Sequence, residues 1–345
     1  MREPPRDLSH DALRGALSAR YGLAAVEIGF LPLGHDALAW VYQVRAADGS
    51  DYFLKAHRGA ISEPGLLVHR FLEETGNTAA IAPLPDTAGR LWTEIAGYSL
   101  VLYPFIAGVT GKDSSMTPQQ WIEYGSVLRR VHDATPPPDL VQRLPRETFV
   151  PYGADLVRRV EPVIAGERFD DEARTPAAFW AARRETIHTL MERAEMLGRR
   201  LAAQAPPFVL CHADTHTANV LIDAGGHVRI VDWDGAVLAP RERDLMFVLD
   251  GGISDRLVRP EDEALFLQGY GPVAADPLAL AYYRYAWAAS DIGEYAVQVF
   301  QRLDLGRADR QEGAERFMSL FEPGEIVSKA LGSPITPHTL PNAFR

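Results

Sequence analysis

The sequence is poor in several residue types, and each shortage excludes a class of protein. Among 345 residues there is a single cysteine, Cys211, which excludes an intramolecular disulfide framework and a cysteine-based zinc cluster. There is no run of about 18 uncharged apolar residues, which argues against a membrane span. The N-terminal residues contain no apolar segment of the kind found in secretory signals. We therefore expect a cytoplasmic protein with no membrane partner.

Lysine is also scarce, since only Lys55, Lys112 and Lys329 stand among 35 basic residues. Acidic residues number 46, which leaves a net charge of −11. An acidic chain is a poor ligand for a phosphate backbone, so we expect no nucleic acid partner. The same charge suits a small cationic ligand, and it also serves solubility. A coding bias that avoids lysine explains the shortage, and under such a bias a retained lysine favours a position that arginine cannot fill.

The rest of the composition is that of an ordinary globular protein, with 47% hydrophobic and 23% charged residues. The length predicts about two domains. Apolar patterning and turn residues predict helices over 9–22 and 65–74 and strands over 26–33, 38–45, 52–56, 90–95 and 99–105. The remainder is mainly helical, with short strands at 208–211, 220–222 and 228–231. We predict an α+β fold, in which an antiparallel sheet lobe precedes a larger, mostly helical lobe.

One segment carries a spaced set of polar residues that suits phosphoryl transfer. It reads His212-Ala-Asp214-Thr-His216-Thr-Ala-Asn219, and Asp232 follows 13 residues after the asparagine, at the end of an apolar stretch. Phosphoryl transfer needs a carboxylate that takes the proton of the acceptor hydroxyl, and further groups that hold magnesium. Magnesium prefers hard oxygen ligands. We assign Asp214 as the base and Asn219 and Asp232 as the metal ligands.

The motif resembles the catalytic and magnesium loops of the aminoglycoside phosphotransferase and choline kinase superfamily, which has a protein-kinase-like fold. The superfamily pattern is His-Gly-Asp-x-His-x-x-Asn-[Ile/Val]-Leu, and Asp232-Trp-Asp234 stands where protein kinases have Asp-Phe-Gly. Downstream, Pro240-Arg-Glu-Arg-Asp244-Leu resembles the superfamily's Pro-x-x-x-Asp-Leu. The resemblance implies that His212 and Asp244 support the catalytic loop. It further implies Mg²⁺ and ATP as cofactors, with GTP left open as the nucleotide.

The resemblance also divides the chain and places a nucleotide site. It implies a nucleotide-binding lobe at 1–103, a hinge at 104–108, and a catalytic and substrate-binding lobe at 109–345. Lys55 ends the apolar stretch Tyr52-Phe-Leu-Lys and corresponds to the lysine that binds the α and β phosphates. Glu63 would be its ion-pair partner, although an acidic residue in the first turn of a helix is ordinary in itself.

Two further parts of that site are predicted from position. Gly34 and His35 lie in the turn between the first two strands, where backbone N–H groups would cover the phosphates. At the hinge, Tyr103 would guard the back of the pocket, and the Pro104 carbonyl and the Ile106 amide would bind adenine. The alternative for this stretch is a buried strand that ends at a turn.

Within the superfamily the chain is most similar to the spectinomycin phosphotransferase branch. The residues that carry this likeness are Tyr103-Pro-Phe-Ile, Asp232-Trp-Asp234 and the segment 238–247. The branch implies a cationic aminocyclitol as substrate, for which carboxylates are the expected binding groups. Asp291 and Glu294 lie three residues apart in a helical stretch and share a face. The implied substrate-binding residues are His216, Asp234, Tyr285, Trp287, Asp291 and Glu294. A loop-packing role for His216, and a solvated helix face with core aromatics, remain alternatives.

These features favour an ATP-dependent O-phosphotransferase (EC 2.7.1) that inactivates an aminocyclitol or aminoglycoside antibiotic, with spectinomycin as candidate. A second interpretation is a kinase for choline, an amino sugar, homoserine, a hygromycin-like compound or a macrolide. The third is an inactive nucleotide-binding module, against which the presence of Lys55, Asp214, Asn219 and Asp232 argues. We expect a monomer or weak dimer whose partner is a small cationic substrate bearing a hydroxyl.

Overall fold

The computed structural model describes residues 3–34, 38–59, 61–77, 79–166, 169–254 and 258–333. The chain forms two compact units, Met1–Pro145 with His212–Val237, and Arg146–Cys211 with Leu238–Arg345. The predicted lobe boundary at the hinge stays a prediction. The first unit nevertheless contains the whole phosphotransfer motif as well as the sheet, so the nucleotide-site and catalytic residues can be described together.

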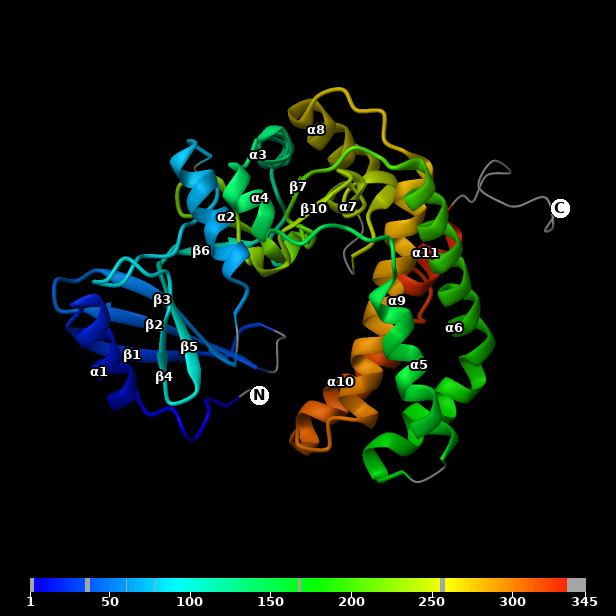
Figure 1. Ribbon diagram of the computed structural model, residues 1–345, viewed down its shortest axis with the longest axis horizontal. Helices are drawn as coiled ribbons and strands as arrows, with labels where there is room; N and C mark the ends of the chain where they lie inside the picture. Colours follow the sequence, from blue (N-terminus) through cyan, green and yellow to red (C-terminus); the bar gives the residue numbers. More distant parts are fainter. Residues whose placement is uncertain are drawn as a thin grey trace. The chain divides into compact units, whose positions relative to one another are not determined.

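The first unit is built on a five-stranded antiparallel sheet with the order β1-β2-β3-β5-β4 (Figure 1). Its strands are β1 (Ala25–Leu31), β2 (Ala39–Ala46), β3 (Asp51–Arg58), β4 (Thr93–Ile95) and β5 (Tyr98–Pro104). The predicted strands are thereby confirmed, although β4 is shorter than expected. In the centre of the sheet Lys55 pairs with Val41 on one side and Val101 on the other. The lysine is therefore held by two neighbouring strands.

The two faces of this sheet are covered by different helices (Figure 1). Ser9 caps α1 (His10–Tyr21), and Leu13 and Leu17 of this helix join the core with Leu54 and Leu100. The second helix, α2 (Glu63–Glu74), packs through Leu66 on the other face, against Val101. Because side chains alternate along a strand, Lys55 lies on the face opposite Leu54. It therefore shares that face with Val101 and α2.

A smaller sheet in the same unit positions the catalytic loop. Its three strands, in the order β6-β8-β9, are β6 (Gly108–Thr110), β8 (Val220–Asp223) and β9 (Val228–Ile230). Val220 pairs with Ile230, so the start of β8 lies beside the end of β9. Residue 219 precedes β8 and residue 232 follows β9, which brings the two predicted metal ligands together. The unit also contains α3 (Pro118–Asp133), α4 (Pro138–Arg143), η1 (Thr217–Asn219) and η2 (Trp233–Gly235).

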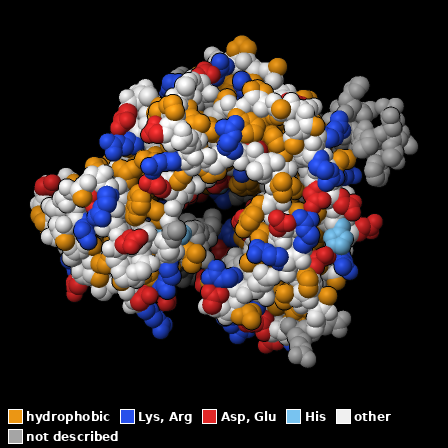
Figure 2. All heavy atoms as spheres, viewed as in Figure 1, with side chains coloured by type: hydrophobic (Ala, Val, Ile, Leu, Met, Phe, Trp, Pro, Cys, Tyr) orange, Lys and Arg blue, Asp and Glu red, His pale blue; other side chains and the backbone are white. Residues whose placement is uncertain are grey.

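The second unit is mostly helical. The long helix α9 packs against α5, α6, α7, α10 and α11, and Tyr282, Tyr283 and Tyr285 of α9 are buried. Figure 2 shows acidic and basic side chains interspersed over one face of the molecule. The elements are α5 (Tyr152–Ala165), α6 (Asp171–Gln204), β7 (Val209–Cys211), β10 (Val237–Ala239), α7 (Glu242–Leu245), η3 (Leu249–Gly251), α8 (Pro260–Tyr270), α9 (Pro277–Phe300), α10 (Arg307–Ser319) and α11 (Ile326–Gly332).

The predicted α+β class is confirmed by this combination of an antiparallel sheet and a larger helical part. Among the described residues, no helix combines the length and apolar character that crossing a membrane requires.

Glycine allows a close helix crossing in the second unit. A Cβ at Gly153 of α5 would lie 2.1 Å from the carbonyl carbon of Ala289 in α9. We expect Gly153→Ala to force the helices apart and to lower the free energy of unfolding by about 1–3 kcal/mol or more. Urea unfolding measures this change. Gly15→Ala in α1 is the control, because its Cβ meets no atom within 4 Å; equal stability losses in the two variants would contradict the explanation.

Candidate active site

Asp214 lies in the loop before η1, between two of the predicted partners. Its Oδ2 accepts a hydrogen bond of 2.9 Å from Nδ2 of Asn219, and its Oδ1 lies 3.2 Å from Nε2 of His216. The same Asn219 amide nitrogen also lies 2.9 Å from the backbone oxygen of Asp214. The side chain of Asp214 is 34% exposed. The carboxylate is thus held in position on a side chain that is partly exposed.

The side chain of His212 anchors the loop that contains Asp214. The ring is fully buried, its Nδ1 accepts from the backbone N–H of Asp214 (3.2 Å), and its Nε2 lies 2.9 Å from the carbonyl oxygen of Val231. Since a carbonyl only accepts, Nε2 carries the proton and donates it. Tyr124 of α3 adds a further hydrogen bond, from its hydroxyl to the carbonyl of Thr215. This placement suits the loop-supporting role predicted for His212.

Lys55 contacts both aspartates of the Asp232-Trp-Asp234 segment. Its Nζ lies 3.1 Å from Oδ1 of Asp232 and 2.6 Å from Oδ2 of Asp234. Burial alone would lower the pKa of Lys55, but the two carboxylates outweigh that effect and raise it. Burial disfavours the charged form of Asp232 as well, yet the charge and hydrogen bond of Lys55 lower its pKa overall. At neutral pH Lys55 is therefore an ammonium group and Asp232 a carboxylate.

The donor set around Asp232 fits a magnesium ion. Asp232 offers carboxylate oxygens, and Asn219 uses its amide nitrogen on Asp214, which leaves its amide oxygen for another partner. These are the hard oxygen ligands that Mg²⁺ prefers. Lys55 already shows that a positive charge is accommodated beside the Asp232 carboxylate.

The predicted ion pair between Lys55 and Glu63 is wrong in this structure. Oε1 of Glu63 lies 3.1 Å from Nη1 of Arg143, at the end of α4, and Lys55 pairs with the two aspartates instead. The physical reason is that Asp232 and Asp234 already satisfy the ammonium group, while Glu63 begins α2 and lies at the exposed end of that helix.

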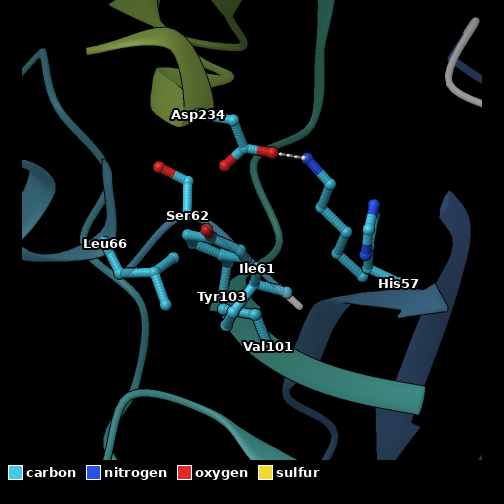
Figure 3. Close-up of a pocket in the computed structure, with 8 residues that line it drawn as sticks. His57, Ile61, Ser62, Leu66, Val101, Tyr103 and Asp234 are labelled. Atoms are coloured by element: carbon cyan, nitrogen blue, oxygen red, sulfur yellow. Dashed lines mark hydrogen bonds and ion pairs between the residues drawn. The ribbon is translucent and has the colours of Figure 1, made fainter. Parts of the chain in front are cut away.

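A cavity of about 230 Å³ lies beside Lys55, between the sheet and the start of α2 (Figure 3). In Figure 3 Asp234 lies opposite Tyr103, Val101 and Ile61, and a dashed line marks its contact with Lys55. Burial raises the pKa of the Tyr103 hydroxyl, so this ring stays neutral. The cavity is lined by Lys55, His57, Ile61, Ser62, Leu66, Val101, Tyr103 and Asp234.

The predicted adenine-binding groups lie where the chain leaves β5. The Phe105 amide donates to the Asp51 carbonyl, and the Leu102 carbonyl accepts from Leu84. Because hydrogen-bonding direction alternates along an antiparallel strand, the Pro104 carbonyl also faces away from β3. This carbonyl can therefore accept a hydrogen bond from a ligand, which is what the predicted contact with the adenine amine requires. The roles of Pro104 and Ile106 stay predictions.

The phosphate-covering turn is described only in part. Gly34 has a φ of +83°, a conformation that glycine adopts without strain. The predicted phosphate-site residue His35 lies outside the described residues, so the roles of Gly34 and His35 stay predictions.

His69 of α2 lies beside the site, where its ring contacts Tyr103 and Trp233. Its side chain is buried. Burial is the main cause that lowers the pKa of His69, to about 3, and nearby His212 contributes to the lowering. A histidine six residues into an amphipathic helix carries no sequence signal that separates it from an ordinary core residue.

Acid should destabilise the protein through His69. The unfolded imidazole has a pKa near 6.5 and the folded one a pKa of about 3, so the unfolded chain binds more protons between these values. This destabilisation is absent above pH 6.5, and it lowers the free energy of unfolding by up to about 1.4 kcal/mol per pH unit as the pH falls towards 3. His69→Phe removes the titrating imidazole and with it this pH dependence. In urea unfolding at pH 7, 6 and 5, the stability of the variant relative to wild type should rise towards acid; a constant difference would contradict neutral burial.

The predicted substrate residues of α9 lie in the second unit, and they do not form one group. Tyr285 is fully buried and its hydroxyl accepts a 2.8 Å hydrogen bond from Arg193 of α6. Trp287 contacts Phe247 edge to face at 5.0 Å, and the guanidinium of Arg243 lies 5.4 Å from its ring centre. Residues two apart on a helix point in different directions, so Tyr285 and Trp287 do not lie on one face of α9, and the substrate-binding role of Tyr285 stays a prediction.

Three of the predicted substrate residues still share one face of α9. Trp287 and Asp291 are four residues apart, and Glu294 follows after three more. The side chains of Trp287 and Asp291 are partly exposed, and that of Glu294 is exposed. Their role in substrate binding stays a prediction.

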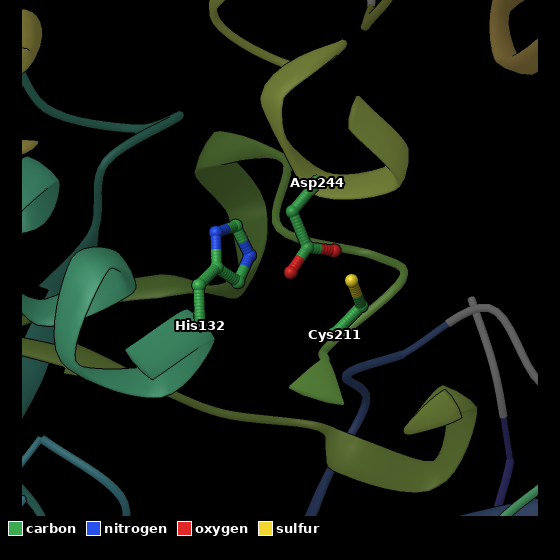
Figure 4. A group of neighbouring side chains, drawn as sticks. All are labelled: His132, Cys211 and Asp244. Atoms are coloured by element: carbon green, nitrogen blue, oxygen red, sulfur yellow. The ribbon is translucent and has the colours of Figure 1, made fainter. Parts of the chain in front are cut away.

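Asp244 is fully buried on α7. One of its carboxylate oxygens lies within 4.8 Å of the sulfur of Cys211 (Figure 4). The Cys211 thiol contacts the carbonyls of Ala239 and Pro240 at 3.6 and 3.5 Å. Burial, and then the neighbouring Asp244, raise the pKa of the thiol. Cys211 is therefore a protonated, unreactive core residue, while the loop-supporting role of Asp244 stays a prediction.

Together, the lysine on β3, the loop with Asp214 and Asn219, and Asp232 after β9 define a kinase-like phosphotransferase. The comparison with known families agrees: the model of the phosphotransferase enzyme family (APH) matches residues 29–287, and the chain belongs to this family.

Individual relatives support the assignment. The chain is 30% identical over 301 residues to Protein StrN of Streptomyces griseus, covering 83% of this chain and 84% of StrN. It is similar to the solved structure of spectinomycin phosphotransferase APH(9)-Ia in complex with ADP and spectinomycin. That likeness has a TM-score of 0.84 and 29% identity, over 94% of this chain and 98% of the other. Amicoumacin kinase hAmiN, at 18% identity, shares the fold with a TM-score of 0.60 over 95% of each chain. The predicted kinase-like fold is thereby confirmed.

Proposed function

We propose that this phosphotransferase moves the γ-phosphoryl group of ATP to a hydroxyl of a cationic aminocyclitol or aminoglycoside antibiotic, with spectinomycin as the first candidate. The observation that carries the proposal is that one unit holds Lys55, Asp214, Asn219 and Asp232 within a connected hydrogen-bond and ion-pair arrangement. The similarity to spectinomycin phosphotransferase along nearly the whole chain supports the choice of acceptor.

The residues of the site have separable tasks in this reaction. Asp214 orients the acceptor hydroxyl and takes its proton as the new bond to phosphorus forms. Lys55 exchanges a carboxylate contact for phosphate oxygens and stabilises their charge. Asp232 and Asn219 would hold Mg²⁺, which neutralises charge on the phosphates when it is bound. Pro104 and Ile106 would bind the base of the nucleotide, while Gly34 and His35 would cover its phosphates.

Acceptor recognition is proposed to rest on negative charge and an aromatic face. Asp234, Asp291 and Glu294 would pair with ammonium groups of the substrate, and the indole of Trp287 would attract a cation. His216 would position the acceptor beside Asp214, from which it is 3.2 Å away.

The experiment that tests the function is ADP release from MgATP across a panel of acceptors, with Asp214→Asn as the blank. The panel contains spectinomycin, other aminoglycosides, hygromycins, macrolides, choline, homoserine and amino sugars. Strong turnover with spectinomycin alone supports the proposed acceptor. Turnover with another compound keeps the phosphotransferase and replaces the acceptor, and no turnover with any cationic antibiotic overturns the antibiotic proposal.

The carboxylates on α9 give a prediction of their own. Asp291→Asn and Glu294→Gln should each raise KM for the acceptor by about 10-fold or slightly more, since one charge-assisted hydrogen bond is worth about 1.5 kcal/mol. KM for ATP should not change. Steady-state kinetics measures both constants, and Glu312→Gln on α10, which removes an exposed pair with Arg316, is the control. An unchanged acceptor KM in both variants would remove these residues from the proposed site.

A further inference from the structure

A short backbone segment lies between the predicted hinge and the loop that carries Asn219. Residues 107–112, which we call the strap, directly follow the predicted adenine-binding residues Pro104 and Ile106. The strap contains β6, which pairs with β8 along its whole length. At its start the carbonyl of Ala107 accepts a 3.0 Å hydrogen bond from the amide of Ala224. The first part of the strap is therefore fixed to the small sheet.

The end of the strap donates hydrogen bonds to the backbone on both sides of Asn219. The amide of Gly111 donates a 2.7 Å hydrogen bond to the carbonyl of Val220, the residue that follows Asn219. The amide of Lys112 donates a 3.0 Å hydrogen bond to the carbonyl of Thr217, two residues before Asn219. Two consecutive amides of the strap thus hold the backbone that carries this asparagine.

The direction of the Asn219 side chain depends on that backbone. Its Nδ2 donates to Oδ2 of Asp214, so its amide oxygen is the atom left for a metal ion. The carbonyl of Asn219 accepts a 3.0 Å hydrogen bond from the amide of Val231, the residue before Asp232. The position of the amide oxygen relative to the Asp232 carboxylate is therefore set by the backbone hydrogen bonds around residue 219, two of which come from the strap.

The close approach of the strap requires glycine at position 111. Gly111 is buried, and a Cβ there would lie 3.1 Å from the carbonyl oxygen of Thr217 and 2.9 Å from the sulfur of Met116. The Met116 side chain is flexible and can adapt, whereas the Thr217 carbonyl belongs to η1 and accepts from Lys112. Because β6 fixes the strap up to residue 110, a side chain at 111 would separate the end of the strap from η1.

We propose that Gly111 is a positioning residue, which lets the strap lie against η1 and thereby keeps Asn219 in the geometry that binds the metal–nucleotide complex. It acts through the backbone of Asn219, not through a side chain of its own. The proposal rests on the metal-ligand role of Asn219 within the proposed function, but it does not depend on which acceptor is used.

The test compares variants by calorimetry of ADP binding with and without Mg²⁺, and by kcat with the best acceptor. We expect Gly111→Ala to weaken MgADP binding and to lower kcat by about 10–100-fold, as loss of an outer support of a metal site does. Binding of metal-free ADP should change by less than about 3-fold on the same scale, because the predicted adenine-binding residues precede the part of the strap that moves.

A double-mutant cycle shows whether Gly111 acts through the asparagine. Asn219→Ala removes the ligand and should itself abolish most of the strengthening of ADP binding by Mg²⁺. Adding Gly111→Ala to Asn219→Ala should then cost less than about 3-fold more, because coupled residues are not additive. If Asn219→Ala kept the full effect of Mg²⁺, the metal-ligand assignment would fail, and the positioning role with it.

Two controls separate positioning from a loss of packing. Gly29→Ala in β1 of the same unit adds a Cβ that meets no atom within 4 Å and should change neither quantity. Met116→Ala removes a buried side chain beside Gly111 and should lower the melting temperature without changing the effect of Mg²⁺. Gly111→Ala/Met116→Ala keeps the contact with the Thr217 carbonyl and should stay defective.

A second variant keeps the proposal testable if Gly111→Ala does not fold. Lys112→Pro removes the N–H that holds the Thr217 carbonyl, and Lys112→Gln is its control for the lost ammonium group. The proposal is overturned if the strap variant binds MgADP like wild type, if it loses metal-free ADP equally, or if Gly111→Ala/Met116→Ala regains wild-type binding. Because ADP binding needs no acceptor, a wrong acceptor cannot produce any of these results.

Discussion

Replacement of Asp214 by asparagine should lower kcat by about 10²–10⁴-fold, the usual contribution of a general base. Asparagine has the same shape and can still accept the hydrogen bond that Asp214 receives from Asn219, but its amide cannot take a proton from a hydroxyl. The loop should therefore keep its structure, and the affinity for ATP should stay within about 2–3-fold of wild type, because the base contributes little to ground-state binding.

Steady-state kinetics and nucleotide titration test this expectation together. Asp133→Asn is the matched control, since this residue of α3 makes an exposed ion pair with Arg129 in the same unit. The control should leave kcat unchanged. If Asp214→Asn turned over at a near wild-type rate, the assignment of the base would be wrong.

Replacement of Lys55 by methionine should lower kcat/KM for ATP by about 10²–10³-fold, as the loss of one charge-stabilising donor does in other active sites. Methionine keeps the length of the side chain and removes its charge. The carboxylates of Asp232 and Asp234 then lose the ammonium group that both contact, and the pKa of Asp232 should rise. The loss should therefore grow as the pH falls, because a protonated Asp232 is a poor metal ligand.

Lys55→Arg separates the effect of the positive charge from the effect of the shape of the group that carries it. It keeps the charge but spreads it over a planar fork that cannot contact the aspartates as the compact ammonium does, so its activity should lie between those of methionine and wild type. Lys329→Arg, in the second unit, is the control for exchanging a lysine for an arginine. Activity in Lys55→Met close to that of wild type would exclude Lys55 from the phosphate site.

Apolar alternation and residue spacing within short segments were enough to predict the strands, the succession of a sheet and then a helical part, and the position of the loop that holds Asp214 and Asn219. The spacing from Asp214 to Asn219 and Asp232 follows from chemistry on one short stretch of chain, and the β8–β9 hairpin brings those residues together with little help from the rest. Lys55 could be found because few lysines are present and one of them ends an apolar strand.

The sequence did not indicate the partners of side chains whose contacts come from distant segments of the chain. Glu63 pairs with Arg143, which is 80 residues away along the chain, and nothing in either local sequence indicates that partner. The hydroxyl of Tyr285 accepts a hydrogen bond from Arg193 of α6, a contact between two helices that the local sequence does not indicate. His69 gave no signal because the rings that it contacts belong to β5 and to the segment after β9.

The ion triplet of Lys55, Asp232 and Asp234 has a consequence for the energetics of substrate arrival. An ammonium group that already has two counterions must give up one of those contacts to bind a phosphate. The gain in interaction free energy is then only the difference between the phosphate contact and the carboxylate contact that it replaces. At the proposed nucleotide site, binding to this lysine would therefore be an exchange reaction, in which Asp234 competes with the incoming anion. Asp234→Asn would remove that competitor, so Asp234 would set how strongly the proposed site discriminates between a triphosphate and weaker anions.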